Sequence, residues 1–248
     1  MNSIYETDRL LGEYLLFHYG SAEEIMPYPS GPRDAFDFPV RCARLCLDDL
    51  PAVPARARAL DVGCAVGRAS FELARHCDTV AGIDFSRRFI DAANILKRAG
   101  ELAFERLDEG TRTTQCFARV PRDIRRDRVT FETGDAMELR KDLGPFDIVL
   151  AANLLCRLAD PAKFLARLPR LVKPGGRLVI TTPCTWLGEF TPPSNWLCDG
   201  KSTTLDGLHR RLDPYFELVK THDLPFLIRE HARKFQWTVA QGSVWTRK

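Results

Sequence analysis

One short stretch of the chain, residues 59–67, restricts the fold more than any other. It reads Ala-Leu-Asp-Val-Gly-Cys-Ala-Val-Gly, an apolar strand that ends in Asp61 and runs into a turn with two glycines. Glycines in such a turn let the backbone reverse and leave it bare where a ligand can approach. A helix is expected to begin at Arg68. The stretch therefore predicts a strand–turn–helix unit with a loop suited to binding a ligand.

The spacing of the turn separates two kinds of nucleotide loop. A dinucleotide site requires G-x-G-x-x-G, whereas this turn is G-x-A-x-G and lacks the Lys-Ser/Thr pair of a triphosphate loop. With Asp61 before it, the turn resembles the first motif of the Rossmann-like S-adenosylmethionine (SAM)-dependent methyltransferases, D/E-x-G-x-G-x-G. Ala65 departs from that motif at the middle glycine. On this turn alone, a purely structural loop remains the alternative.

Two further strands end in an acid. Residues 79–84 end in Asp84, and residues 129–135 end in Asp135. A carboxylate after the second strand suits the hydroxyls of a ribose, and in the methyltransferases that the turn resembles the third position faces the adenine amino group. Carboxylates gathered along one sheet edge are costly unless a cation or a hydroxyl-rich ligand lies there. SAM carries both a sulfonium and a ribose, so it suits such an edge. The alternative to a ligand site is that these acids only cap the helices that follow.

Strands and helices alternate through most of the chain. Ser86 is expected to cap a helix after the second strand. A fourth strand is expected at 146–152 and a fifth at 177–182, with a helix between them that begins at Asp160-Pro161. Strand–helix–strand units repeated through five strands predict a parallel sheet with helices on both faces. Two more strands, 216–221 and 236–245, would complete the α/β fold of the Rossmann-like class I SAM-dependent methyltransferases, a mostly parallel seven-stranded sheet.

We expect one globular unit built from two parts. Residues 1–50 form an N-terminal helical cap that packs on the core, and residues 51–248 form the SAM-dependent methyltransferase domain. The cap either packs only or also covers the cofactor pocket with Tyr5 or Tyr14. Residues 100–128 are polar and of mixed charge, so they are expected to be a long solvated loop. Residues 227–234 join the two tail strands and are expected to be a short helix.

Composition excludes several classes of function. The 248 residues are 45% apolar and carry a net charge of +3, which indicates a globular protein without a nucleic-acid partner. No apolar run approaches the roughly 20 residues of a membrane span, and the first residues lack the order of a signal peptide. The eight cysteines are scattered, so we expect no metal site and reduced thiols in a cytoplasmic protein.

The residues expected to bind the donor share one place, the carboxyl ends of the strands. Arg41 of the cap is added because it could reach the methionine carboxylate of SAM, although a solvated arginine is the alternative. The expected set is Asp61, Gly63, Cys64, Ala65, Gly67, Asp84, Phe85, Asp135, Ala136, Asn153 and Arg41.

The acceptor is expected to lie after the fourth and fifth strands. An N-P-P-Y run would indicate an amide or exocyclic amine, but the sequence there is Asn153-Leu-Leu-Cys156. Cys184 after the fifth strand resembles the nucleophile of the cytosine C5 RNA methyltransferases, whose D-x-P-C run is absent, so a thiol of the pocket wall is the simpler interpretation. Aromatic walls with both charge signs suit a zwitterionic small molecule. The alternative for Arg229, Glu230 and His231 is surface salt bridging. The candidates for binding the acceptor or for catalysis are Tyr14, Arg157, Trp186, Glu189, Arg229, Glu230 and His231.

A closer resemblance covers essentially the whole chain. The stretches at 5–20, 60–67, 82–93, 151–157 and 225–237 are together similar to the methyltransferase domain of ovothiol biosynthesis, the 4-mercaptohistidine N-methyltransferase family. Alanine is the normal middle residue of the glycine turn in that family. The domain often follows an iron-dependent sulfoxide synthase in one polypeptide, so such a synthase is expected as a separate or fused partner. A stand-alone protein and an excised domain both remain open, as does the oligomeric state.

The resemblance implies a reaction. SAM and 5-thiohistidine would give S-adenosylhomocysteine and ovothiol A by methylation of an imidazole nitrogen. Glu189 or His231 would assist deprotonation of that nitrogen or orient the ring, Arg229 or Arg157 would hold the substrate carboxylate, and Trp186 would form a wall. The alternatives are methylation of another natural-product amine or thiol, a SAM-binding module without catalysis, and the RNA methyltransferase above.

Overall fold

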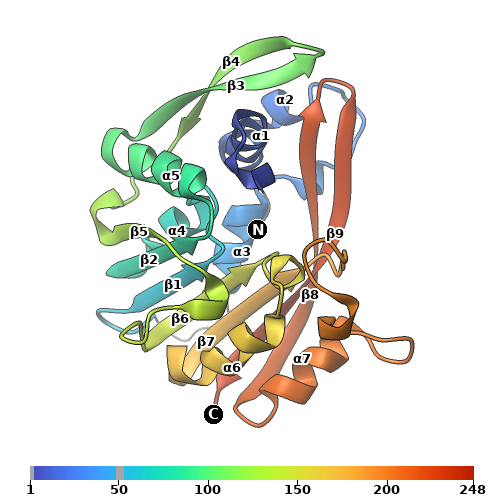
Figure 1. The fold of residues 1–248 in the computed structure, drawn as a ribbon. Helices are drawn as coiled ribbons and strands as arrows, with labels where there is room; N and C mark the ends of the chain where they lie inside the picture. The colour runs from blue at the N-terminus through green and yellow to red at the C-terminus, as the bar shows by residue number, and fades with distance from the viewer. Residues whose placement is uncertain (1–2, 49–52) are drawn as a thin grey trace.

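A seven-stranded sheet forms the centre of the computed structural model, which describes residues 3–48 and 53–248 (Figure 1). The strand order is β5-β2-β1-β6-β7-β9-β8. The first five strands in this order are parallel, and β9 is antiparallel to both of its neighbours. This confirms the predicted fold class. The strands are β1 Arg58–Val62, β2 Thr79–Asp84, β5 Val129–Thr133, β6 Phe146–Ala152, β7 Val172–Thr182, β8 Phe216–His231 and β9 Lys234–Arg247.

Two hydrophobic cores lie on opposite faces of this sheet, because successive residues of a strand point to opposite sides. In β1, Ala59 belongs to the core that contains Phe71 and Phe89, whereas Leu60 belongs to the core that contains Phe164. The first core is covered by α1 Asp8–Tyr19, α2 Ala22–Ile25, α3 Phe38–Leu45, α4 Arg68–Leu73 and α5 Arg87–Ala99, and the second by α6 Pro161–Leu171 and α7 Thr204–Leu212. Short 3-10 helices occur at Ser3–Glu6, Arg33–Ala35, Arg126–Arg128, Ala136–Glu138, Leu155–Arg157 and Pro193–Asn195.

Side-chain caps fix where two of the helices begin. Ser86 accepts a hydrogen bond from the backbone N–H of Phe89 at the start of α5. Asp160 accepts one from the backbone N–H of Ala162, and Pro161 occupies the first turn of α6. Such caps satisfy N–H groups that have no partner inside the helix. Both starts are those predicted from the sequence.

The segment 100–128 is not a long loop, and this prediction was wrong. It contains an antiparallel hairpin of β3 Glu101–Glu109 and β4 Arg112–Arg119, which lies over α1 in Figure 1. Phe104 and Cys116 are buried in the same core as Leu15 and Leu16 of α1. The polar residues that suggested a solvated loop form the outer face of a sheet whose inner face packs on a helix.

The tail also differs from the prediction, because residues 227–234 are not helical. Strand β8 continues to His231 and β9 begins at Lys234. Strand β7 pairs with β9 only from Gln241 onward, so the end of the hairpin, residues 224–240, extends past the sheet (Figure 1). We call this segment the arm. It lies beside the N-terminal helices and thereby closes one side of the space above the sheet.

No helix in the described parts of the chain is long and apolar enough to cross a membrane. All eight cysteines are free thiols, and six of them are buried. Burial raises the pKa of the Cys42 and Cys77 thiols to about 12, which keeps them protonated and unreactive.

Candidate functional site

A cavity of about 960 Å³ lies at the carboxyl ends of the central strands. Its floor is the glycine turn after β1 together with the ends of β2, β5 and β6. Its roof comes from α1, and one side comes from the arm. Ligands of open parallel sheets bind in this position, so the cavity is the candidate site.

The glycine turn is held in an unusual backbone conformation. Gly63, Ala65 and Gly67 all have positive φ, at 76°, 46° and 86°. A Cβ on Gly67 would lie 2.5 Å from Cζ of Phe131, so no other residue fits there without a shift. Ala65 adopts a conformation that favours glycine, and its backbone N–H donates to Asp84 Oδ2 at 2.9 Å. The second acid therefore shapes the loop as well as the cavity.

Asp84 lies at the centre of this floor. Its Oδ1 accepts a hydrogen bond from the Ser86 backbone N–H at 2.9 Å, and its side chain lines the cavity. Burial raises the pKa of Asp84 to about 6. An ionised carboxylate here is therefore costly without a ligand and is favoured by hydroxyl donors or a cation.

Asp61 lies deeper than Asp84. It is 1% exposed and accepts a hydrogen bond of 2.6 Å from the Ser70 hydroxyl. Burial raises its pKa to about 7, and the charge of Asp84 adds to the shift. Asp135 also lines the cavity and accepts from the Met137 backbone N–H at 2.8 Å. The three carboxylates form one wall, which suits a ligand with a positive charge and hydroxyls.

Aromatic rings form the part of the cavity away from these acids. The ring centroids of Tyr14 and Phe89 are 4.7 Å apart, and Tyr5 meets both of them edge-on. The guanidinium of Arg157 lies 4.7 Å from the centroid of Phe190. Its Nη1 donates to the backbone carbonyls of Cys156 and Thr185, so the cation is fixed at the edge of the cavity. A fixed cation beside aromatic rings suits the carboxylate of an aromatic amino acid.

The arm supplies residues that the sequence did not indicate. Ile228 pairs with Gln236, and Phe226 pairs with Thr238, across β8 and β9. All four residues line the cavity. Alternation in the strands shows that they share a face, but nothing in the sequence tells which face meets the cavity.

Twelve of the residues expected to bind donor or acceptor do line the cavity. They are Tyr14, Asp61, Gly63, Cys64, Ala65, Asp84, Phe85, Asp135, Ala136, Asn153, Arg157 and Glu189. Asn153 also has positive φ, 52°, and its Oδ1 accepts from the Thr181 hydroxyl at 3.0 Å. This links the ends of β6 and β7 under the cavity.

Trp186, Gly67 and Arg41 lie outside the cavity lining, which corrects their expected positions. The Trp186 indole is 9% exposed and donates to the Thr204 hydroxyl at 2.9 Å, so it is a core residue. Gly67 lies under Phe131. Arg41 donates to the backbone carbonyls of Phe36 and Pro225, which fastens α3 to the arm.

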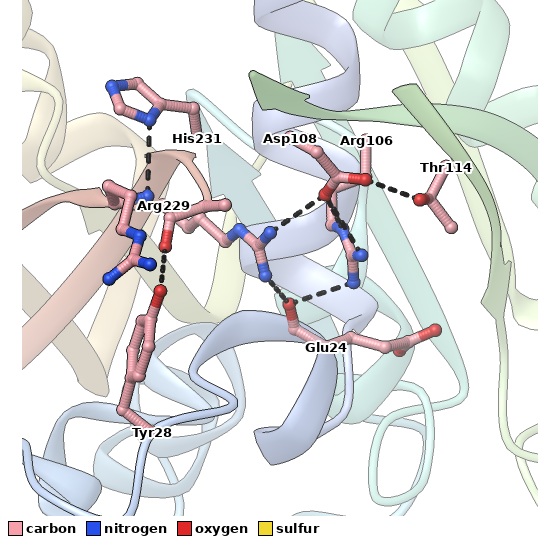
Figure 2. A network of polar contacts seen from close by, with 9 residues as sticks. Glu24, Tyr28, Arg106, Asp108, Thr114, Arg229 and His231 are labelled. Carbon is pink, nitrogen blue, oxygen red and sulfur yellow. Dashed lines mark hydrogen bonds and ion pairs between the residues drawn. The ribbon is translucent and has the colours of Figure 1, made fainter. Parts of the chain in front are cut away.

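The three polar residues of the tail, Arg229, Glu230 and His231, also lie outside the cavity lining. Figure 2 shows Arg229 with Asp108 and Glu24, and His231 near them. Arg229 is 4% exposed and donates to Asp108 at 3.0 Å and to the Glu24 carbonyl at 2.7 Å. Glu230 bonds Lys234 and Gln236, and His231 Nδ1 accepts from the Arg233 backbone N–H. Because the chain is a strand here, Arg229 points to the face opposite Ile228, toward the β3–β4 hairpin.

The fold and the site define a class. A sheet with this strand order, a glycine turn after β1 and carboxylates after β1, β2 and β5 is the architecture of the Rossmann-like class I SAM-dependent methyltransferases. The cavity residues fit such a donor, since bare backbone at Gly63 and the carboxylates of Asp61 and Asp84, with raised pKa values, are present where it would lie.

Comparisons with known proteins agree with this class. A family model described as a methyltransferase domain matches residues 35–236. A ubiquinone biosynthesis O-methyltransferase of Coxiella burnetii (strain Dugway 5J108-111) is 29% identical over 123 residues, which are 50% of this chain and 42% of the relative. One from Maricaulis maris (strain MCS10) is 26% identical over 174 residues, 70% of this chain and 57% of the relative. The match therefore spans about half the length of these curated relatives.

A solved structure supports the fold. The N-methyltransferase NodS from Bradyrhizobium japonicum WM9, in complex with S-adenosyl-L-homocysteine, is 15% identical and superposes with a TM-score of 0.54, covering 96% of this chain and 98% of that chain. Because the family model spans most of the sequence, the chain belongs to the methyltransferase domain family.

Proposed function

We propose that the protein transfers a methyl group from SAM to an imidazole nitrogen of 5-thiohistidine, giving ovothiol A and S-adenosylhomocysteine. The single observation that supports this most is the division of one cavity into an acidic wall after β1, β2 and β5 and an aromatic region with Arg157. The first part suits a sulfonium and a ribose, and the second suits a small aromatic amino acid. The resemblance of the whole chain to the ovothiol methyltransferase domain supplies the acceptor.

The donor half of the proposal assigns a role to each floor residue. Bound SAM supplies a methyl group on a positively charged sulfur. Asp84 accepts hydrogen bonds from the ribose hydroxyls, Asp135 faces the adenine, and the backbone at Gly63 and Ala65 lies against the methionine portion. Phe85, which is 54% exposed, covers the adenine. The buried Asp61 stabilises positive charge from beneath.

The acceptor half concerns orientation. Arg157 on the face of Phe190 binds the substrate carboxylate, and Tyr5 and Tyr14 contact the ring. An unprotonated ring nitrogen forms the new bond to the methyl carbon while the carbon–sulfur bond breaks and its electron pair stays on the donor sulfur. The proton of the product ring leaves to Glu189, which is exposed and lines the cavity, or to water. Aligning the two reactants and excluding water account for most of the acceleration.

The decisive experiment is a panel of acceptors at equal concentration, with products identified by mass spectrometry. It contains 5-thiohistidine, histidine, a catechol and a small thiol, because the curated relatives are named as O-methyltransferases and a thiol is the other soft nucleophile. Methylation of a ring nitrogen of 5-thiohistidine, with catalytic efficiency well above that of the other members, is expected. If another compound of the panel is methylated with higher efficiency, that compound takes the place of 5-thiohistidine as the acceptor. Binding of SAM without methylation of any panel member indicates a SAM-binding module without catalysis.

Glu189 provides a second test. Glu189→Gln is expected to lower kcat between about 100- and 10,000-fold, because general base catalysis contributes on this scale, with little change in donor affinity. Glu217→Gln is the matched control, since that glutamate is exposed on β8 and lies outside the cavity. Equal activity of the Glu189→Gln variant and the wild type would remove Glu189 from the mechanism and leave water as the proton acceptor.

A further inference from the structure

A histidine that no sequence motif indicated lines the cavity. His18 lies near the end of α1, and its Nδ1 is enclosed without a hydrogen-bond partner. Among residues 3–48 and 53–248 nothing hydrogen-bonds to the other ring nitrogen, and Nε2 is not enclosed. Buried polar groups are almost always paired in folded proteins. A ring without partners at a cavity wall therefore indicates that its partner is a ligand.

The surroundings of His18 are aromatic. Its ring stacks with Tyr14 at a centroid distance of 5.9 Å and meets Phe17 edge-on at 5.3 Å. Phe17 lies 5.9 Å from both Phe38 and Phe226, which are 4.9 Å apart. We call the space beside Tyr14, Phe17, Phe38 and Phe226 the aromatic compartment. All four line the cavity, and such walls suit a planar ring.

This compartment adjoins the acidic wall but is built by other elements. The two parts meet at Tyr14, on which the charge of Asp84 acts, and at His18, on which Arg68, the residue after Gly67 of the glycine turn, acts. The compartment is built by α1, α3 and β8, and none of these elements carries the glycine turn or the three carboxylates. The aromatic walls around His18, which suit a planar ring, favour the acceptor over the donor as its ligand.

His18 is a neutral ring. Burial, with a smaller contribution from Arg68, lowers its pKa to about 3. A neutral imidazole has one N–H and one lone pair. An enclosed N–H without a partner is rarer in proteins than an enclosed acceptor without one, so the proton is placed on Nε2, the nitrogen that the cavity leaves accessible.

We propose that His18 binds the acceptor, with its Nε2–H donating a hydrogen bond to an unprotonated atom at the edge of a planar heteroaromatic ring held in the aromatic compartment. The assignment rests on the proposed function, because it requires an acceptor of this shape. A neutral donor orients the ring without protonating it, which matters because the attacking nitrogen must keep its lone pair. His18 and Glu189 thus have different tasks, orientation and proton acceptance.

The test compares two substitutions of equal length. His18→Gln keeps an N–H close to the position of Nε2, whereas His18→Met removes it. The measurements are KM and kcat with 5-thiohistidine, or with the preferred panel member if it is another, and the dissociation constant of S-adenosylhomocysteine by calorimetry, which also reports folding. His222→Gln is the control, because His222 Nε2 is likewise buried without a partner but lies outside the cavity.

The expected result is a split between the two ligands. His18→Met raises KM for the acceptor at least tenfold and leaves the affinity for S-adenosylhomocysteine within twofold, while His18→Gln recovers most of the loss and His222→Gln resembles the wild type. An equal loss of donor affinity would place His18 in the donor site. Equal impairment of both His18 variants would indicate packing alone, and unchanged kinetics of His18→Met would remove the role, so each of these outcomes overturns the proposal.

The two proposals fail in different ways. A wild-type protein that methylates no member of the panel refutes the proposed function, and the assignment of His18 falls with it. A wild-type protein that methylates a panel member while His18→Met does so equally well refutes the assignment of His18 alone.

Discussion

Replacing Asp84 by asparagine separates ligand binding from stability. Each carboxylate oxygen of Asp84 accepts one backbone N–H, from Ala65 and from Ser86. The asparagine keeps one oxygen, so one backbone N–H faces an amide N–H₂. Leaving a buried donor unsatisfied costs about 1–3 kcal/mol. Against this, burial raises the pKa of Asp84 from 3.8 to about 6, so the ionised side chain costs about 3 kcal/mol at neutral pH.

These two effects on stability oppose each other. The free energy of unfolding is therefore expected to change by no more than about 2 kcal/mol, and Tm by a few degrees. Donor affinity behaves differently, because the asparagine loses one charge-assisted hydrogen bond to the ribose, worth roughly 1.5–3 kcal/mol. The dissociation constant of S-adenosylhomocysteine is expected to rise about 10- to 150-fold.

The assay is calorimetric titration with S-adenosylhomocysteine at pH 7.5, together with thermal unfolding of the ligand-free protein. Asp91→Asn is the matched control, since Asp91 is exposed on α5 and lies outside the cavity. A folded Asp84→Asn variant that binds the ligand within threefold of the wild type would refute the placement of the donor at this sheet edge.

Three further predictions concern pH, packing and a buried ion pair. Burial raises the pKa of Asp61 to about 7 and that of Asp84 to about 6. A carboxyl group whose pKa is raised in the folded state stabilises that state at low pH. This contribution is lost as the pH rises through the raised pKa. The free energy of unfolding of the ligand-free protein is therefore expected to fall as the pH rises from about 4 to about 7. The affinity for SAM is expected to rise at most about 20-fold between pH 6 and 8, because the cation favours the ionised forms. Affinity that is flat or falls over this range in calorimetric titrations would contradict the assignment. Gly67→Ala is expected to destabilise the protein by about 2–4 kcal/mol, because the residue has positive φ and its Cβ would meet Phe131. The control Gly110→Ala has positive φ but open space around its Cβ, so it is expected to cost about 1–2 kcal/mol. Urea unfolding measures both free energies, and equal costs would show that the contact with Phe131 is unimportant. Arg229→Ala is expected to destabilise the protein by about 3 kcal/mol. This is at the lower end for a broken buried ion pair, because Arg106 still lies 3.1 Å from Asp108. KM for the acceptor is expected to stay within twofold, and a large rise in KM in the folded variant would show that Arg229 binds the acceptor.

Local patterns in the sequence were enough to predict the sheet. A strand that ends in an acid and a turn that requires positive φ at Gly63 depend on neighbouring residues only, so the floor of the cavity could be assigned before the structure. The same holds for the start of α5 at Ser86, where the cap is three residues from its partner. Short-range geometry of this kind is encoded by residue type and spacing.

Prediction failed where local preference and tertiary packing disagree. Residues 101–119 looked like a solvated loop because one face of the hairpin is polar, and only packing on α1 shows that Phe104 and Cys116 are buried. The sequence 227–234 resembled a short charged helix, but pairing between β8 and β9 holds it extended. Cross-strand hydrogen bonds and burial decide such cases, and neither is visible in a local window.

The sequence by itself determined the sheet, the glycine turn and the acidic wall, because these follow from the order of short segments. Only the tertiary structure decided the other half of the cavity. His18 is far along the chain from Phe226 and Gln236, and the three residues meet because α1 and the arm fold over the same edge of the sheet. A strand presents alternate residues to two faces, and which face meets the cavity depends on how the arm lies against the rest of the fold.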